Sequence, residues 1–196
     1  MSKKIAITGG IGSGKSSVVN VLREMGYPVF SCDEIYANLR ESKEYLQKLS
    51  TVFPQAVVDG RLDRKRLSEI VFQNPEKREV LNELSHPMIM QTLNALINER
   101  REPFVFAEVP LLFENGFEKD FDAVIVVKRN IDERINAICQ RDEITENQAR
   151  QRINAQFDYD DPQNQNYLQS IHAYIIENDE AKMDLIKKTK DIFKKL

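Results

Sequence analysis

Residues 9–16 constrain the fold more than any other part of this sequence. The segment has glycine at its first and sixth positions, followed by Lys15 and Ser16, which is the spacing of a phosphate-binding loop. The apolar run at residues 4–8 predicts a strand before it, and residues 15–25 have the pattern of a helix after it. A strand, a glycine-rich loop and a helix in this order predict an α/β fold that binds a polyphosphate.

The residue types in this loop suit a nucleotide. Glycines let successive backbone N–H groups turn toward a polyphosphate, and the helix end adds partial positive charge. We expect Lys15 to reach the β- and γ-phosphates and the Ser16 hydroxyl to coordinate Mg²⁺. The expected ATP-binding residues of the loop are Gly10, Ile11, Gly12, Ser13, Gly14, Lys15, Ser16 and Ser17. The alternative is a glycine-rich turn without a ligand.

Four further runs predict strands, at residues 28–31, 103–108, 123–127 and 174–177. Near-continuous apolar runs that alternate with helical patterns indicate a buried parallel sheet covered by helices. The length of 196 residues suits one such domain with a small inserted subdomain.

The insertion is expected at residues 34–101, where we find only helix signals. The expected helix starts are Asp63 as the cap of a helix that ends at Phe72, Asn74 with Pro75, and Pro87 after His86. This stretch is too long for one crossover helix, so we interpret it as a substrate-binding subdomain.

A second helical region follows the run at 123–127. Asn130 can cap a helix that extends to Arg141, and residues 145–148 form a capping box. Residues 157–166 are acidic, rich in amides and broken by Pro162, which predicts either a mobile loop or an ordinary surface connection.

The tail from Asp179 has the pattern of an amphipathic helix, with lysines on or near its exposed side. They are Lys187, Lys188, Lys190, Lys194 and Lys195. A solvated terminal helix is favoured over a nucleic-acid patch, because 28 Lys and Arg against 31 Asp and Glu give a net charge of −3. We expect no nucleic-acid partner.

Two cysteines, Cys32 and Cys139, are too far apart in the sequence for a metal-binding pair, so we expect free thiols in a reducing compartment. We find neither an apolar run long enough to span a membrane nor a signal-peptide pattern. The expectation is a soluble, cytoplasmic protein without a membrane partner.

The motifs narrow the class of nucleotide-binding protein. The Asn-Lys-x-Asp motif of guanine readers and the signature motif of transport ATPases are both absent from the sequence. A phosphotransferase of the nucleoside-monophosphate-kinase type, which uses ATP and Mg²⁺ and has an acceptor subdomain and a lid beside the phosphate loop, is therefore favoured. The acceptor stays open between a nucleoside monophosphate and another small molecule. From a different class, the alternative is a nucleotide-binding switch without turnover.

Several separated segments resemble the dephospho-coenzyme A kinase family. They are residues 7–16, Cys32 with Asp33, residues 84–87, residues 109–114, Arg141 with Asp142, Arg152 with Ile153, and Gln156. The resemblance implies transfer of the ATP γ-phosphoryl group to the 3′-hydroxyl of dephospho-CoA, which yields CoA and ADP.

The resemblance also implies a P-loop kinase fold with a five-stranded parallel sheet and a helical lid. We expect a nucleotide-binding core at residues 1–33, 102–130 and 171–196, a CoA-binding subdomain at 34–101 and a lid at 131–170. The expected partners are ATP and dephospho-CoA, in a monomer or small homo-oligomer.

Two residues gain catalytic roles beside Lys15 from the resemblance. Asp33 matches the family aspartate that faces the acceptor hydroxyl, and a carboxylate there can take a proton. The alternative is a helix cap. Arg141 matches the lid arginine that stabilises charge on the moving phosphoryl group, and the alternative is an exposed arginine at a helix end.

Other matched residues suggest binding roles. Glu108 stands where the family usually has Asp and could act through water on Mg²⁺ or on the acceptor, while Asn178 matches an asparagine near the adenine. His86 matches a His-Pro element beside the acceptor, although its residue type alone favours a hydrogen-bonding role at a helix start. The expected substrate-binding set is Thr8, Asp33, His86, Glu108, Pro110 and Leu111.

The chain departs from the family pattern in the lid. Ala137 stands where the family has arginine, whereas Arg134 lies a turn earlier and shares a helix face with Arg141. We expect Arg134 to compensate in part.

Overall fold

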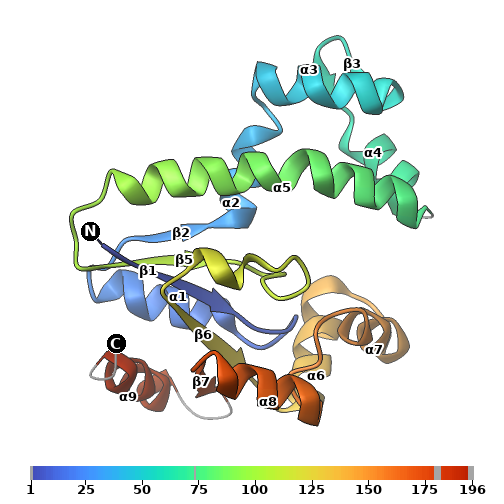
Figure 1. The fold of residues 1–196 in the computed structure, drawn as a ribbon. Helices are drawn as coiled ribbons and strands as arrows, with labels where there is room; N and C mark the ends of the chain where they lie inside the picture. Colours follow the sequence, from blue (N-terminus) through green and yellow to red (C-terminus); the bar gives the residue numbers. More distant parts are fainter. Residues whose placement is uncertain (1, 73, 179–181, 194–196) are drawn as a thin grey trace. The chain divides into compact units, whose positions relative to one another are not determined.

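The computed structural model describes residues 2–72, 74–178 and 182–193. The chain divides into two compact units (Figure 1). We call Met1–Val29 with Arg100–Leu196 the sheet unit, and Phe30–Glu99 the helical unit.

The predicted five-stranded sheet is confirmed. Its strands are β1 (Lys3–Thr8), β2 (Val29–Ser31), β5 (Phe104–Glu108), β6 (Ala123–Lys128) and β7 (Tyr174–Glu177). Their order is β2-β5-β1-β6-β7, and β1 pairs in parallel with β5 and β6 on its two sides. The connections thus change direction at β1, and in such sheets ligands bind beyond the carboxyl end of the strand at that point.

The helices of the sheet unit are α1 (Lys15–Glu24), α6 (Ile131–Asp142), α7 (Glu146–Asn154), α8 (Pro162–Ser170) and α9 (Lys182–Phe193), with a short 3₁₀ helix at Phe117–Asp120. Apolar residues of α1 and α9 pack with Ile7, Ile125 and Ile176 in one core. Alternate residues such as Ile175 point to the opposite face, toward α8.

Two predicted helix starts in this unit are confirmed. The Asn130 side chain accepts a hydrogen bond from the Asp132 N–H, and Thr145 with Gln148 forms the capping box of α7. In α9, Lys187 and Lys190 are exposed as expected. Residues 179–181, Lys194 and Lys195 lie outside the described residues.

The prediction of a loop over residues 157–166 is wrong from Pro162 onward. Pro162 is the first residue of α8, and the Asp161 side chain accepts hydrogen bonds from the N–H groups of Gln163 and Asn164. Proline suits a first helical position because its missing N–H has no partner there in any helix. Before α8, Tyr159 is buried, so that part of the segment is packed rather than solvated.

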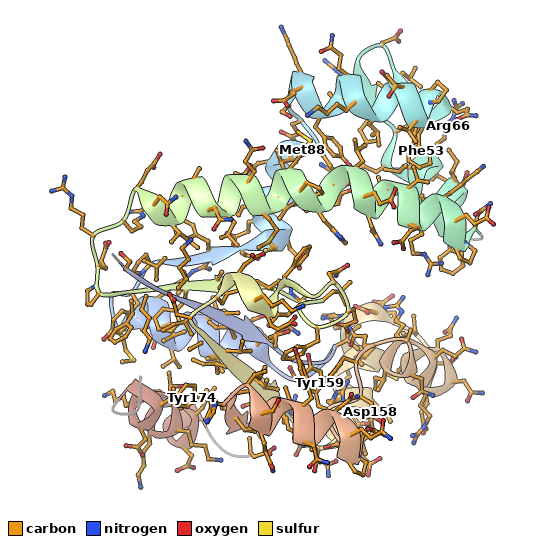
Figure 2. All side chains as sticks on the ribbon, in the orientation of Figure 1. Phe53, Arg66, Met88, Asp158, Tyr159 and Tyr174 are labelled. Atoms are coloured by element: carbon orange, nitrogen blue, oxygen red, sulfur yellow. The ribbon has the colours of Figure 1, made fainter. Side chains whose placement is uncertain are left out.

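The helical unit contains α2 (Cys32–Leu39), α3 (Lys43–Val52), a 3₁₀ turn (Pro54–Ala56), α4 (Arg64–Phe72) and α5 (Pro75–Asn98). Its core is formed by Tyr45, Leu49, Phe53, Ala56 and Leu67, of which Phe53 is labelled in Figure 2. The predicted caps are confirmed: Asp63 accepts from the Arg66 N–H, and Asn74 accepts from the Lys77 N–H.

Two predictions for this unit are wrong. Pro87 does not begin a helix but lies inside α5, where packing against α2, α3 and α4 offsets the hydrogen bond that proline cannot make. Residues 34–101 also contain a small hairpin, β3 (Val57–Val58) with β4 (Arg61–Leu62). Its turn residues Asp59 and Gly60 have φ values of 50° and 71°, as a two-residue hairpin turn requires, and Asp-Gly was the overlooked signal.

Among the described residues, no helix combines the length and the apolar character that crossing a bilayer requires.

Candidate functional site

The phosphate-binding loop joins β1 to α1 and lies tightly against its neighbours. Gly9 has a φ of 147°, and a Cβ at this position would lie 2.2 Å from the Val127 carbonyl oxygen. Gly14 has a φ of 84° and is the N-cap of α1, and a Cβ there would lie 2.1 Å from Nδ2 of Asn178. Both positions therefore require glycine for conformation and for space.

Lys15 folds over the loop. Its Nζ donates hydrogen bonds to the carbonyl oxygens of Gly9 at 2.8 Å and Gly10 at 3.2 Å. The Ser13 hydroxyl is buried and has no hydrogen-bond partner among the described residues. Ser16 and Ser17 are exposed in the first turn of α1. An ammonium, an unsatisfied hydroxyl and a helix N-terminus at one place suit an anion with several oxygens.

The middle of the loop is held by α6, by α7 and by the segment that follows α7. Nε of Arg134 donates to the Ile11 carbonyl oxygen at 3.0 Å, and the Ile11 N–H donates to Oε1 of Gln156 at 2.6 Å. The Ile11 side chain packs into the apolar cluster of these helices, which includes Ile135 and Ile138. The backbone of the loop is thus fixed from behind by side chains of the predicted lid.

Arg134 is 8% exposed, an uncommon burial for a guanidinium. Burial lowers its pKa, while Asp160, Tyr159 and Asp158 act in the opposite direction. A hypothetical Cβ on Gly10 would lie 2.2 Å from its Nη2, so the guanidinium lies directly against the loop. The nearby acidic groups favour its charged form at neutral pH.

Arg141 is placed differently. Its side chain is 61% exposed, and its guanidinium donates to both carboxylate oxygens of Asp142 at 2.7 and 3.0 Å. The hydrogen bond with Asp142 raises the pKa of Arg141 and lowers that of Asp142, which also pairs with Arg152. The structure therefore brings Arg134, and not Arg141, to the loop.

Asn178 connects the end of β7 to the loop. Its Nδ2 donates to the Ser13 carbonyl oxygen at 2.9 Å, and its backbone N–H donates to the Lys128 carbonyl oxygen at 2.8 Å. The asparagine that the sequence suggested for the adenine region thus lies against the turn that begins α1.

Thr8 and Glu108 end neighbouring strands. Thr8 is fully buried, and its hydroxyl is 3.4 Å from that of Tyr159, whose pKa is raised by burial. Glu108 lies opposite Ile7 in the sheet register and is therefore close to the start of the loop. Pro110 and Leu111 follow after Val109, and Leu111 is 41% exposed.

Asp33 and His86 belong to the helical unit. Asp33 is exposed in the first turn of α2, whose N-cap is Ser31, so the interpretation of Asp33 as a helix cap is wrong. His86 lies inside α5 and not at a helix start, beside the buried Ser85. Burial lowers the pKa of His86, and Glu79 opposes this with a smaller effect.

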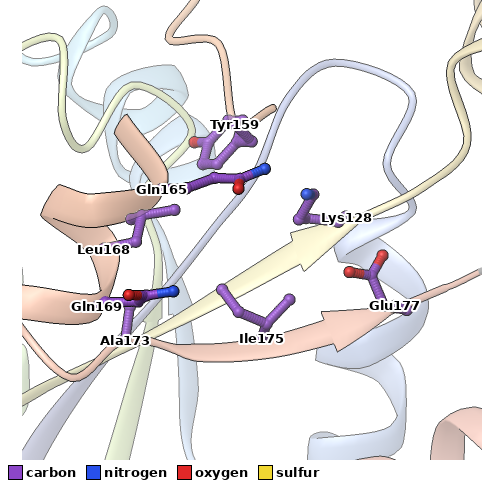
Figure 3. Close-up of a pocket in the computed structure, with 8 residues that line it drawn as sticks. All are labelled: Lys128, Tyr159, Gln165, Leu168, Gln169, Ala173, Ile175 and Glu177. Carbon is purple, nitrogen blue, oxygen red and sulfur yellow. The ribbon is translucent and has the colours of Figure 1, made fainter. Parts of the chain in front are cut away.

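A cavity of about 240 Å³ lies beside β6, β7 and α8 (Figure 3). Its lining residues are Lys128, Tyr159, Gln165, Leu168, Gln169, Ala173, Ile175 and Glu177. None of the site residues expected from the sequence is in this set. Tyr159, which lines the cavity and also contacts Thr8, was missed because it lies in a segment that looked solvated.

The sheet order and the loop define the class of protein as a P-loop kinase. A shikimate kinase structure from Acinetobacter baumannii has this fold, with a TM-score of 0.58 at 15% identity over 100% of this chain and 94% of that one. A dephospho-CoA kinase structure from Campylobacter jejuni has a TM-score of 0.65 at 22% identity, over 99% of this chain and 97% of that one.

Within this class, a family model described as dephospho-CoA kinase matches residues 3–184. A dephospho-CoA kinase from Thermus thermophilus is 40% identical over 78% of this chain and 74% of its own length. A dephospho-CoA kinase from Fusobacterium nucleatum is 35% identical over 94% of this chain and 93% of its own length. The chain belongs to the dephospho-CoA kinase family.

Replacement of Arg134 tests the support of the loop. Arg134→Ala removes the charged donor to Ile11, so we expect the KM for ATP to rise by roughly 10- to 100-fold, as loss of a hydrogen bond from a charged group predicts. Arg134→Lys should recover part of the affinity. The control Arg150→Ala, at an exposed arginine of α7 paired with Glu146, should leave KM unchanged. An unaltered KM for ATP in Arg134→Ala would contradict the assigned support.

The burial of His86 predicts a pH dependence of stability. Because its pKa in the folded state is below the usual value of 6.5, the unfolded chain binds the proton more readily. The free energy of unfolding should therefore decrease as the pH falls through about 6.5 toward 5. Urea titrations at several pH values should show a weaker decrease for His86→Gln. The exposed His172, changed to Asn, is the control, and identical pH profiles for both variants would refute the assignment.

Proposed function

We propose that this protein transfers the γ-phosphoryl group of ATP to the 3′-hydroxyl of dephospho-CoA, giving CoA and ADP, in the last step of CoA biosynthesis. The proposal is carried by the phosphate-binding loop, over which Lys15 folds, in a chain that belongs to the dephospho-CoA kinase family. The family finding favours this substrate over those of other small-molecule kinases and favours an enzyme over a switch without turnover.

ATP binding is assigned to the sheet unit. The backbone of residues 10–17 receives the phosphates, and Lys15 exchanges its carbonyl partners for β- and γ-phosphate oxygens. Ser13 offers its unsatisfied hydroxyl. Asn178 fixes the turn that presents these groups and borders the nucleoside.

Mg²⁺ fits the donor set at the start of α1. The exposed Ser16 hydroxyl would hold the ion together with phosphate oxygens and water, the mixed coordination that Mg²⁺ prefers over a cage of protein ligands. Bound there, the ion would neutralise phosphate charge. Glu108, near the loop, would act through water on the ion or on the acceptor.

Asp33 is assigned to the acceptor. The 3′-oxygen forms a bond to the γ-phosphorus, the bond from that phosphorus to the β–γ bridging oxygen breaks, and the hydroxyl proton passes to the Asp33 carboxylate. Arg141 would stabilise charge on the transferred group after exchanging Asp142 for a phosphate oxygen. Arg134 acts indirectly, because its hydrogen bond to the Ile11 carbonyl oxygen positions the loop.

The remaining acceptor residues have supporting roles. His86, Pro110 and Leu111 border the acceptor, whereas the buried Thr8 acts through Tyr159. The helical unit binds the rest of dephospho-CoA. We place the reaction in the cytoplasm, in agreement with the free thiols of Cys32 and Cys139, with the protein as a monomer or small homo-oligomer.

The direct test measures ADP and CoA formation from ATP, Mg²⁺ and dephospho-CoA. We expect turnover with dephospho-CoA and a much lower kcat/KM with AMP, which lacks the pantetheine arm and its binding energy. Equal kcat/KM for AMP and dephospho-CoA would instead indicate a nucleoside-monophosphate kinase.

Replacement of Lys15 tests the role of the phosphate-binding loop. Lys15→Ala should abolish transfer, because the loop loses its fixed charge, while circular dichroism shows an intact fold.

Asp33→Asn separates binding from chemistry. The change keeps the size of the side chain but removes the proton acceptor, so kcat should fall by roughly 10²-fold or more at an unchanged KM for ATP. The neighbouring exposed carboxylate, changed as Glu34→Gln, is the control and should keep wild-type kcat. Full activity of Asp33→Asn would transfer the acceptor role to Glu108.

A further inference from the structure

One arginine of the helical unit has an incomplete set of hydrogen-bond acceptors. Nε of Arg40 is buried without a hydrogen-bond partner among the described residues. The guanidinium instead lies over the Tyr36 ring, with Cζ 4.8 Å from the ring centroid. A charged donor left unsatisfied by the fold is costly, and a bidentate oxyanion is the partner that best completes it.

A chain of hydroxyl groups leads to the same place. The Tyr45 hydroxyl donates to that of Tyr36 at 3.3 Å and is 2.9 Å from the Ser85 hydroxyl. Burial raises the pKa of Tyr45, which therefore stays protonated. Because Tyr45 gives its one proton to Tyr36, Ser85 must donate to Tyr45. The Tyr36 hydroxyl oxygen thus accepts the hydrogen bond from Tyr45. Its own proton stays available for a hydrogen bond to another acceptor beside Arg40.

The position of these groups on α2 relates them to Asp33. Asp33, Tyr36 and Arg40 are spaced by three and four residues and share one helix face. The Arg40 guanidinium reaches back over Tyr36, which is three residues, or about 4.5 Å along the axis, from Asp33. In dephospho-CoA the 3′-hydroxyl and the 5′-diphosphate are attached to one ribose and are separated by only a few bonds.

We propose that Arg40, with the Tyr36 hydroxyl, binds the 5′-diphosphate of the acceptor while Asp33 faces the 3′-hydroxyl of the same ribose. This inference rests on the proposed function and adds a binding site for the acceptor's anionic group. It makes α2 the element that selects acceptors with a diphosphate over nucleosides without one.

The test compares two acceptors that share the ribose hydroxyl, dephospho-CoA and adenosine, with radiolabelled ATP as donor. Arg40→Ala should raise the KM for dephospho-CoA by roughly 10-fold or more, while kcat, the KM for ATP and the kcat/KM for adenosine change by less than about twofold. Tyr36→Phe, which keeps the ring under the guanidinium, should raise the same KM less. Arg40→Lys should lie between wild type and Arg40→Ala, because a lysine keeps the charge but not the fork. The control Arg61→Ala, an exposed arginine of the same unit, should have no effect.

Four results would overturn the inference. An unchanged KM for dephospho-CoA removes the assigned contact, and an equal loss with both acceptors indicates only a structural role at the end of α2. If Arg40→Ala does not fold, the Arg40→Lys and Tyr36→Phe variants provide the test. A wild-type KM for dephospho-CoA in both of them would refute the inference. Failure of the wild-type protein to phosphorylate dephospho-CoA would refute the proposed function itself, and the inference with it.

Discussion

The buried contact between Arg134 and the Ile11 carbonyl is the interaction on which the nucleotide site depends. Backbone N–H groups can hold a polyphosphate only if the loop that carries them is fixed from behind. Arg134 and the apolar contacts of Ile11 provide this support from α6 and α7. Gln156 provides it from the segment after α7, and Asn178 from the residue after β7. Ligand-binding groups and their supports thus come from distant parts of the sequence.

In the helical unit, a polar group lies within an apolar core and is hydrogen-bonded there. Tyr45 is fully buried, yet its hydroxyl joins Ser85 on α5 to Tyr36 on α2. This hydrogen-bonded chain satisfies the buried hydroxyls and orients Tyr36 next to Arg40. The packing of α2 on α5 therefore also orders the face that carries Asp33.

Local patterns predicted most elements correctly because their signals are short-range. The apolar runs marked all five strands, and Asp63, Asn74, Asn130 and Thr145 were recognisable as caps because each bonds within its own first turn. Pro87 was misassigned because proline has the same local pattern at a helix start and inside a long helix. Only packing of neighbouring helices distinguishes these two cases.

The sequence by itself determined the phosphate loop, the parallel sheet and the family, because these depend on glycine spacing, apolar runs and residue identity. Tertiary structure alone decided which arginine reaches the loop. Arg134 and Arg141 share a helix face, but one is buried against Ile11 and the other is paired with Asp142 at the surface. The burial of Arg134 arises from a contact between segments more than 100 residues apart, Ile11 with Arg134, whereas Arg141 pairs with its neighbour in the sequence. Helical periodicity carries no information about the first of these contacts.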